Sequence, residues 1–334
     1  MAVPSVPRCT RQGGDALTEA RAVPTTHGLD ARWGYLFAAL AAIVSGVSVY
    51  VNSFGVRLFA DATVYTMLKN GVVGFVLLLL LALSWRRWHV YRALSRRQLV
   101  WLIVLAVVGG SVPYVLFFHG LQLTDPVTGA LLNHLQFAFV ALIAAVFLRE
   151  SLAPAMWAAV ALILVGTTLG TNLGHIHWNL GAWMVLGSTL LFAIDFVITK
   201  HLLRDLPTLT VMAAKMTLGS IILVGLVAAS GDLAAVGQLT ARQWTFVIAT
   251  GLILLVFTAT MFIAIRRIPV TAVVAIGMGA PIITALVDFA ASGHLRLPLV
   301  NSLGLLATLV AVAGILILGT RRAAQDRHLQ RTEP

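Results

Sequence analysis

The chain has 334 residues, of which 59% are hydrophobic and only 10% are charged, and its formal net charge is +11. A soluble globular domain carries about 25% charged residues, so the composition excludes that class and indicates an integral membrane protein. The mean hydropathy of +0.94 agrees with this class. Because a chain inside lipid must satisfy its own backbone polar groups, we expect an all-α fold.

Residues 1–33 are polar, rich in Pro, Gly, Thr and Arg, and contain no apolar stretch. They lack the apolar core of a secretory signal peptide, and we interpret them as a disordered cytoplasmic arm. The single cysteine, Cys9, lies in this arm. An intrachain disulfide and a thiolate metal site are therefore excluded, and we expect neither a metal nor a cofactor.

Ten segments that follow the arm are apolar enough to cross a bilayer, which requires about 17 to 25 residues. In chain order they are 34–54, 63–84, 99–120, 127–148, 155–172, 178–199, 209–230, 243–265, 270–291 and 299–319. Short connections between them leave no room for a soluble domain, and residues 321–334 form a cytoplasmic tail.

Positive charge is distributed unevenly between the two sides of this arrangement. Of the 23 Lys and Arg residues, 18 fall in the arm, the tail and the connections on one side, and three fall on the other. Because Lys and Arg accumulate on the cytoplasmic side, we predict a multi-pass protein of the cell (inner) membrane with both termini in the cytoplasm. The net charge then reflects topology, and nucleic acid is not an expected partner.

The ten spans divide into two halves of five, residues 34–172 and 178–320, that share an ordered series of motifs. Asp-Pro-Val-Thr-Gly-Ala at 125–130 corresponds to Ile-Pro-Val-Thr-Ala-Val at 268–273. A second proline opens the next span in each half, at Pro154 and Pro298. Because five is odd, the second half must cross the membrane in the opposite sense, and such inverted repeats are typical of secondary transporters.

Charged side chains inside spans are costly, about 2.5–3.5 kcal/mol each at mid-helix, and usually face a partner or a cavity. Asp195 and Lys215 lie about five and six residues from the same predicted cytoplasmic boundary, so we expect an ion pair. The pair either only joins two helices or is functional, with Asp195 exchanging a proton or Lys215 meeting an anionic substrate. Independent extension of the two side chains toward the interface is the third alternative. Lys69 has no acid at matching depth and is expected to extend toward the outer face, and Asp288 is expected at the interface.

Polar and aromatic side chains recur at helical spacing on one face of four spans. The stripes are Ser45, Ser48 and Asn52; Ser111, Tyr114, Phe118 and Gln122; Asn133, Gln136 and Phe137; and Ser188, Phe192, Asp195 and Thr199. Such faces turn inward in lipid, so they predict a central cavity, with interhelical hydrogen bonding as the alternative. The candidate substrate-binding residues are Asn52, Lys69, Ser111, Tyr114, Phe118, Asn133, Gln136, Phe192, Asp195 and Lys215.

Two spans contain residues that interrupt helices. Pro113 follows Gly109-Gly110 in the third span, and Pro281 follows Gly277 and Gly279 in the ninth. Such breaks free backbone groups or permit bending, so these sites are predicted as hinges or as ordinary kinks.

The stretch Ala-Leu-Leu-Asn-His-Leu-Gln-Phe-Ala-Phe-Val-Ala-Leu-Ile-Ala-Ala-Val-Phe-Leu-Arg-Glu at 130–150 resembles the drug/metabolite transporter superfamily, EamA-type branch. There the fourth helix of the half-repeat ends with an apolar run and a Glu, here Glu150. Phe192-Ala-Ile-Asp195 and Lys215-Met-Thr-Leu-Gly219 resemble a subgroup with Asp in the sixth helix and Lys-Gly in the seventh. The resemblance covers residues 34–320 and implies export of amino acids, related metabolites or toxic organic compounds, with exchange against protons as one form of coupling.

These patterns predict a secondary transporter that works by alternating access, with a small-molecule substrate and the lipid bilayer as its partners. The chain has no His-Glu-x-x-His zinc site, no Gly-x-Ser-x-Gly elbow and no phosphate-binding loop, so an enzyme is not expected. A membrane receptor or assembly partner and an intramembrane enzyme are the alternatives. Substrate identity, direction, coupling to protons and oligomeric state stay open at this point.

Overall fold

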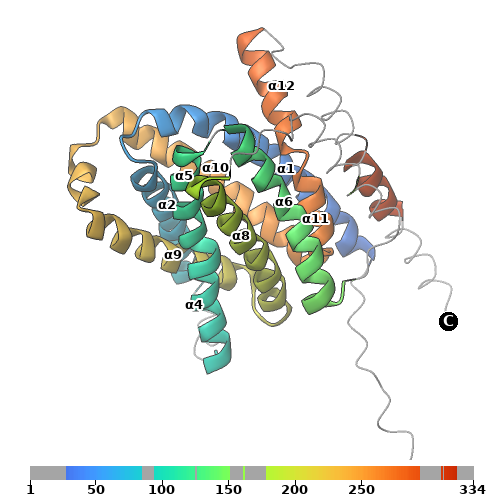
Figure 1. Cartoon of the computed structure of the whole chain (residues 1–334). Helices are drawn as coiled ribbons and strands as arrows, with labels where there is room; N and C mark the ends of the chain where they lie inside the picture. The colour runs from blue at the N-terminus through green and yellow to red at the C-terminus, as the bar shows by residue number, and fades with distance from the viewer. Residues whose placement is uncertain are drawn as a thin grey trace, which may run out of the picture.

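The structure is a computed structural model of the whole chain, and it describes residues 28–84, 94–124, 126–150, 161, 178–293, 310 and 312–321. Within these residues the regular elements are helices, without a strand (Figure 1). The fifth predicted span, 155–172, and most of the tenth, 299–319, lie outside the described residues. The structure therefore does not test the count of ten.

Within the described residues, the first half of the chain contributes five α-helices and one π-helical turn. They are α1 (Gly28–Arg57), α2 (Ala62–Leu83), α4 (Arg96–Gly110), α5 (Val112–Leu123), α6 (Pro126–Ile143) and the turn η2 (Ala144–Leu148). The starts follow from the sequence: Asp61 accepts a hydrogen bond from the Thr63 amide at the N-terminus of α2, and Ser95 and Gln98 form a capping box at the start of α4. Such caps satisfy backbone amides that a helix leaves free at its first turn.

The second half contributes α8 (Leu180–Asp205), α9 (Thr208–Ser230), the 3₁₀ turn η4 (Asp232–Gln238), α10 (Ala241–Arg267), α11 (Val270–Gly277) and α12 (Ala280–Ser292). Gly231 ends α9 with φ of 85°, a left-handed conformation that favours glycine. A further apolar helix covers Val312–Arg321.

Seven stretches of the described helices are long and apolar enough to cross a membrane. Both predicted interruptions are present, because the third span divides into α4 and α5 at Ser111 and the ninth divides into α11 and α12 at Met278 and Gly279. One boundary was wrong: the sixth span does not end near Lys200 but continues as α8 to Asp205. The apolar periodicity stops at Lys200, yet its ammonium group finds partners inside the protein, so the helix has no reason to end there.

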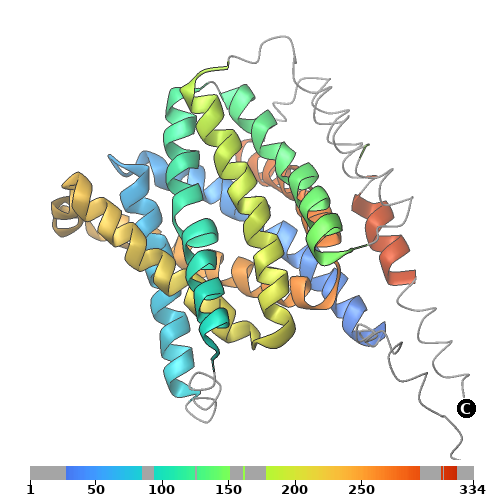
Figure 2. The ribbon, with the colours of Figure 1, turned by 60° about the horizontal axis from the view of Figure 1, so that its bottom comes forward.

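The helices pack in an arrangement that places the two halves of the chain against each other. α1 lies along α10 and α12, α2 lies along α9, and α8 runs between the α4–α5 pair and α6 (Figure 2). A close crossing joins α4 to α9, where Gly110 and Gly219 meet backbone to backbone. Large apolar side chains such as Phe75 and Leu83 lie on the outside, 69% and 72% exposed, as expected for a surface that faces lipid.

Candidate functional site

An ion pair between α8 and α9 is the central polar feature of the described structure. The Lys215 Nζ lies 2.6 Å from the Asp195 Oδ2, and each residue is 3% exposed. The expected ion pair is thus present. With the corrected end of α8, Asp195 lies ten residues, about 15 Å, from the end of its helix, near the middle of this 26-residue element.

Short side chains and an aromatic ring enclose this pair. Gly109 of α4 lies so close to the Asp195 carboxylate that a Cβ at that position would overlap it. Thr199, one turn along α8, donates to the Asp195 Oδ1 over 3.5 Å. The Lys215 ammonium group lies 5.6 Å from the centre of the Phe262 ring of α10, within cation–π range. Helices α4, α8, α9 and α10 therefore all contribute to the surroundings of the pair.

The break in the third span lies directly against the ion pair. Proline has no backbone N–H, so Pro113 cannot donate to the carbonyl of Gly109 four residues earlier. The Tyr114 amide donates instead to the Ser111 carbonyl over 3.1 Å. The chain therefore loses regular helical hydrogen bonds at the point where Gly109 meets Asp195. Inside a membrane, non-helical backbone of this kind is tolerated where it is buried in protein or lines a water-filled cavity.

Two aromatic residues that were predicted as binding residues lie beside this break. The rings of Tyr114 on α5 and Phe192 on α8 make an edge-to-face contact with centroids 5.1 Å apart. Phe192 lies one turn before Asp195 on α8, and Tyr114 interacts electrostatically with the Asp195 carboxylate. The structure therefore brings Tyr114, Phe192, Asp195 and Lys215 into one neighbourhood.

A second polar cluster joins α1 to α2 and contains Lys69. The Asn52 Oδ1 accepts hydrogen bonds from the Tyr65 hydroxyl at 2.5 Å and from the Lys69 Nζ at 3.4 Å, and the Asn52 amide donates to the Ser48 Oγ at 2.9 Å. Lys69 is 9% exposed and its ammonium group lies 5.2 Å from the centre of the Tyr65 ring. An amide oxygen and an aromatic ring therefore hold the Lys69 ammonium group inside the protein, and its extension toward the outer face stays a prediction.

The other predicted site residues are less informative. The Ser111 hydroxyl donates to the Ala106 and Val107 carbonyls of its own helix, and Ser188 donates to the Val185 carbonyl. Both serines therefore bond to carbonyls within their own span, and these bonds support neither the cavity nor the interhelical alternative. Asn133 and Gln136 on α6 are half-buried, and so is Phe118 on α5. Within the described residues no hydrogen bond or ion pair links the Asp195 cluster to the Lys69 cluster.

Sequence reasoning missed a set of contacts at the end of the bundle where η2, α8 and α10 finish. The Glu150 carboxylate accepts hydrogen bonds from the amides of Val270 and Thr271, at 2.9 and 3.3 Å, and from the Thr271 hydroxyl at 3.0 Å. The Lys200 Nζ donates to the carbonyls of Ile265 and Ile268, at 2.6 and 2.8 Å. The negative Glu150 thus lies at the amino end of α11 and the positive Lys200 at the carboxyl end of α10. Each charge is opposite in sign to the partial charge of that helix end.

The signal for these contacts was present in the sequence. Glu150 closes the first-half motif, and Thr271 belongs to the Pro-Val-Thr motif of the second half. Spacing alone did not indicate that one motif binds the other. No group of three or more His, Cys, Asp or Glu side chains that could hold a metal ion occurs in the parts of the chain that the structure describes.

Comparisons with known proteins agree with the fold. A curated protein from Methanothermobacter thermautotrophicus (strain Delta H), described as an uncharacterized transporter, is 22% identical over 210 residues, which are 58% of this chain and 60% of that protein. A crystal structure of another protein superposes with a TM-score of 0.65 and 17% identity, covering 85% of this chain and 98% of that one. The model of the EamA-like transporter family matches residues 32–171 and again residues 179–320. Since these two matches cover most of the sequence, the chain is a membrane protein that belongs to the EamA-like transporter family.

Proposed function

We propose that this protein is a secondary transporter that exports small polar or amphipathic organic solutes, such as amino acids, related metabolites or drugs. Family membership supports a membrane transporter, and the solute class, the direction and the mechanism are our proposal. The observation that carries it is the Asp195–Lys215 ion pair, buried between two membrane-length helices beside a break in the third span. Ionisable groups inside a membrane span are expensive, so a functional role is the default hypothesis.

The chemistry around the pair suits an organic solute better than a bare ion. Lys215 offers a cation to a carboxylate, Asp195 offers an acceptor to an amine, and Tyr114 with Phe192 offers an aromatic wall. A zwitterionic solute could replace the internal ion pair by binding both charges, and Asp195 would carry a proton if transport is coupled to protons.

Alternating access would use the two interrupted spans as hinges. In this proposal the ten helices form two inverted halves, residues 34–172 and 178–320, and both termini are cytoplasmic in the inner membrane. The contacts of Glu150 with Thr271 and of Lys200 with the end of α10 would then close the cytoplasmic side. Substrate export would require these contacts to open and re-form in each cycle.

Transport by the purified protein in liposomes tests the proposal. A panel of radiolabelled amino acids and related metabolites is offered with and without a pH gradient, to wild type, Asp195→Asn and the control Asp288→Asn. Asp288 lies on α12 and is also an acidic residue of a span, but it is outside the Asp195 cluster. Solute flux that Asp195→Asn abolishes and Asp288→Asn preserves is the expected result.

The outcomes distinguish the parts of the proposal. Flux that a pH gradient accelerates in wild type, but not in a partly active Asp195→Asn variant, supports proton coupling through this carboxylate. Flux that does not change with the pH gradient indicates a facilitator. Unchanged flux in Asp195→Asn would remove Asp195 from the site, and no flux of any solute by folded wild-type protein would favour a receptor or assembly partner.

A further inference from the structure

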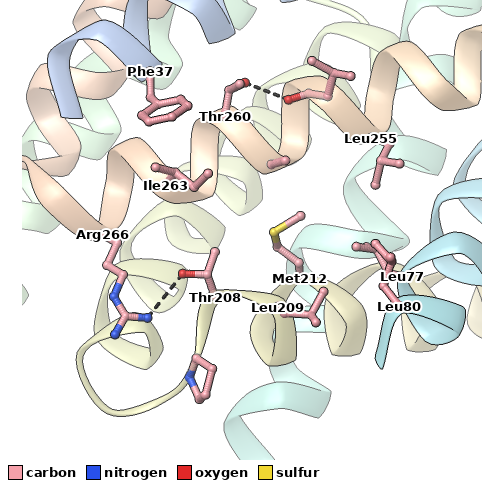
Figure 3. A pocket seen from close by; sticks show the side chains of 13 residues that line it. Phe37, Leu77, Leu80, Thr208, Leu209, Met212, Leu255, Thr260, Ile263 and Arg266 are labelled. Carbon is pink, nitrogen blue, oxygen red and sulfur yellow. Dashed lines mark hydrogen bonds between the residues drawn. The ribbon is translucent and has the colours of Figure 1, made fainter. Parts of the chain in front are cut away.

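A groove separate from the Asp195 cluster opens among α1, α2, α9 and α10. Its volume is about 800 Å³. Figure 3 shows the side chains that line it. None of the ten predicted binding residues lines it. Its position therefore does not follow from the proposed transport site.

The walls of the groove are apolar along most of its length. Leu77 and Met212 lie at its base, 1% and 5% exposed, whereas Leu80 and Val256 are 46% and 47% exposed and form its open side. On α10 the groove extends from Leu255 to Arg266, eleven residues or about 16 Å. One leaflet of the hydrocarbon core is about 15 Å thick, so the groove has the length of an acyl chain in a single leaflet.

One end of the groove carries positive charge. Arg266 is exposed there, and its Nη1 donates to the Leu206 carbonyl and to the Thr208 hydroxyl, each at 3.3 Å. Figure 3 shows the contact with Thr208. The guanidinium of Arg267 lies 5.6 Å from the centre of the Phe37 ring, which also lines the groove. No carboxylate pairs with either arginine within the described part of the chain.

We propose that this groove binds one anionic phospholipid of the leaflet that the Arg266 end of α10 reaches. The acyl chain lies against Leu77, Met212 and Val256, and the phosphate accepts hydrogen bonds from the Arg266 Nε and Nη2, which the contacts to Leu206 and Thr208 leave available. Those two contacts also hold the guanidinium at the end of the groove. A guanidinium matches phosphate geometry and is less strongly hydrated than an ammonium group, so it suits this interface.

The inference depends on the charge as much as on the apolar walls. Any acyl chain would find an apolar groove favourable, so a zwitterionic lipid with the same chains must bind less tightly if the arginine selects the headgroup. One Lys or Arg near an anionic membrane surface contributes about 1 kcal/mol, which corresponds to about a fivefold preference. The two lipids therefore provide a direct measurement of the role of Arg266.

Native mass spectrometry of the full-length protein in detergent tests the proposal. Phosphatidylglycerol and phosphatidylcholine with identical acyl chains compete for wild type, Arg266→Gln, Ala259→Phe and the control Arg242→Gln. Arg242 is also exposed and lies in the first turn of α10, at the opposite end from the groove. Ala259 lines the groove, so a phenylalanine there fills it without changing charge.

We expect wild type and Arg242→Gln to retain one phosphatidylglycerol with a preference of about fivefold. Arg266→Gln should lose the preference while still binding lipid, and Ala259→Phe should lose the bound lipid of either kind. Equal retention of the two lipids by wild type, or equal loss of preference in Arg242→Gln and Arg266→Gln, would overturn the proposal. Size-exclusion chromatography confirms that each variant is folded, and if Ala259→Phe fails to fold, the comparison of the two arginine variants still decides.

Discussion

Replacing Lys215 with methionine should destabilise the protein strongly, because it leaves the Asp195 carboxylate buried without its partner. At 2.6 Å and an effective dielectric constant of about 20, Coulomb's law gives roughly 6 kcal/mol of attraction for the pair. Desolvation costs several kcal/mol for each ion and offsets most of this gain. Removing one partner removes the attraction but not the other ion's desolvation, so the expected loss is about 3–5 kcal/mol in the free energy of unfolding.

The same reasoning predicts that the double variant Asp195→Leu/Lys215→Met recovers most of the lost stability. Because the second substitution also removes the remaining buried ion, the double variant should lie within about 1–2 kcal/mol of wild type. Unfolding by sodium dodecyl sulfate in mixed micelles, followed by tryptophan fluorescence, measures the free energies of all four forms of the cycle. Lys69→Met is the control, because the Lys69 ammonium contacts a neutral amide and should cost about 1 kcal/mol or less.

A small effect of Lys215→Met would refute this account. If that variant loses less than about 1 kcal/mol, or if the double variant is less stable than both single variants, the pair does not behave as two buried charges that compensate each other. A loss in Lys69→Met equal to that in Lys215→Met would also contradict the reasoning, since burial of any lysine would then explain both.

Two further predictions concern packing and a helix end. Gly219→Ala should lose about 1–3 kcal/mol of unfolding free energy in the same assay, because its Cβ would lie 2.8 Å from the Gly110 Cα. The control Gly225→Ala has open space at its Cβ and should be neutral or slightly stabilising. Glu150→Ala removes the acceptor of the Val270 and Thr271 amides at the start of α11 and should cost about 1–2 kcal/mol; unchanged stability would show that this contact does not hold the helix end.

Most of the helical arrangement follows from apolar length and from residues with fixed backbone preferences. Pro113 and Pro281 indicated where the third and ninth spans divide, because proline cannot continue the hydrogen-bond ladder of a helix. The end of α8 was misplaced because a lysine usually marks a boundary, whereas Lys200 binds two carbonyls at the end of α10. Such partners come from segments more than 60 residues away, so local sequence contains no signal for them.

The candidate site was also only partly predictable from the sequence. The ion pair could be predicted because Asp195 and Lys215 lie on consecutive spans, so their depths could be compared. The contacts of Lys69 could not, because hydrogen bonding to Asn52 depends on how α1 and α2 face each other. The apolar groove beside Arg266 was missed for another reason: apolar residues that line a groove and apolar residues that face lipid have the same composition.

The contact between Gly110 and Gly219 can act as a pivot about which α9 rotates against α4. Lys215 lies four residues from Gly219, about 6 Å along α9, whereas the far end of that helix at Ser230 lies eleven residues away, about 16 Å. A rotation of about 10° around this point would move Lys215 by only about 1 Å but would move Ser230 by about 3 Å, as follows from these lever lengths. The far end of α9 could therefore move while Lys215, close to the pivot, remains within ion-pair distance of Asp195.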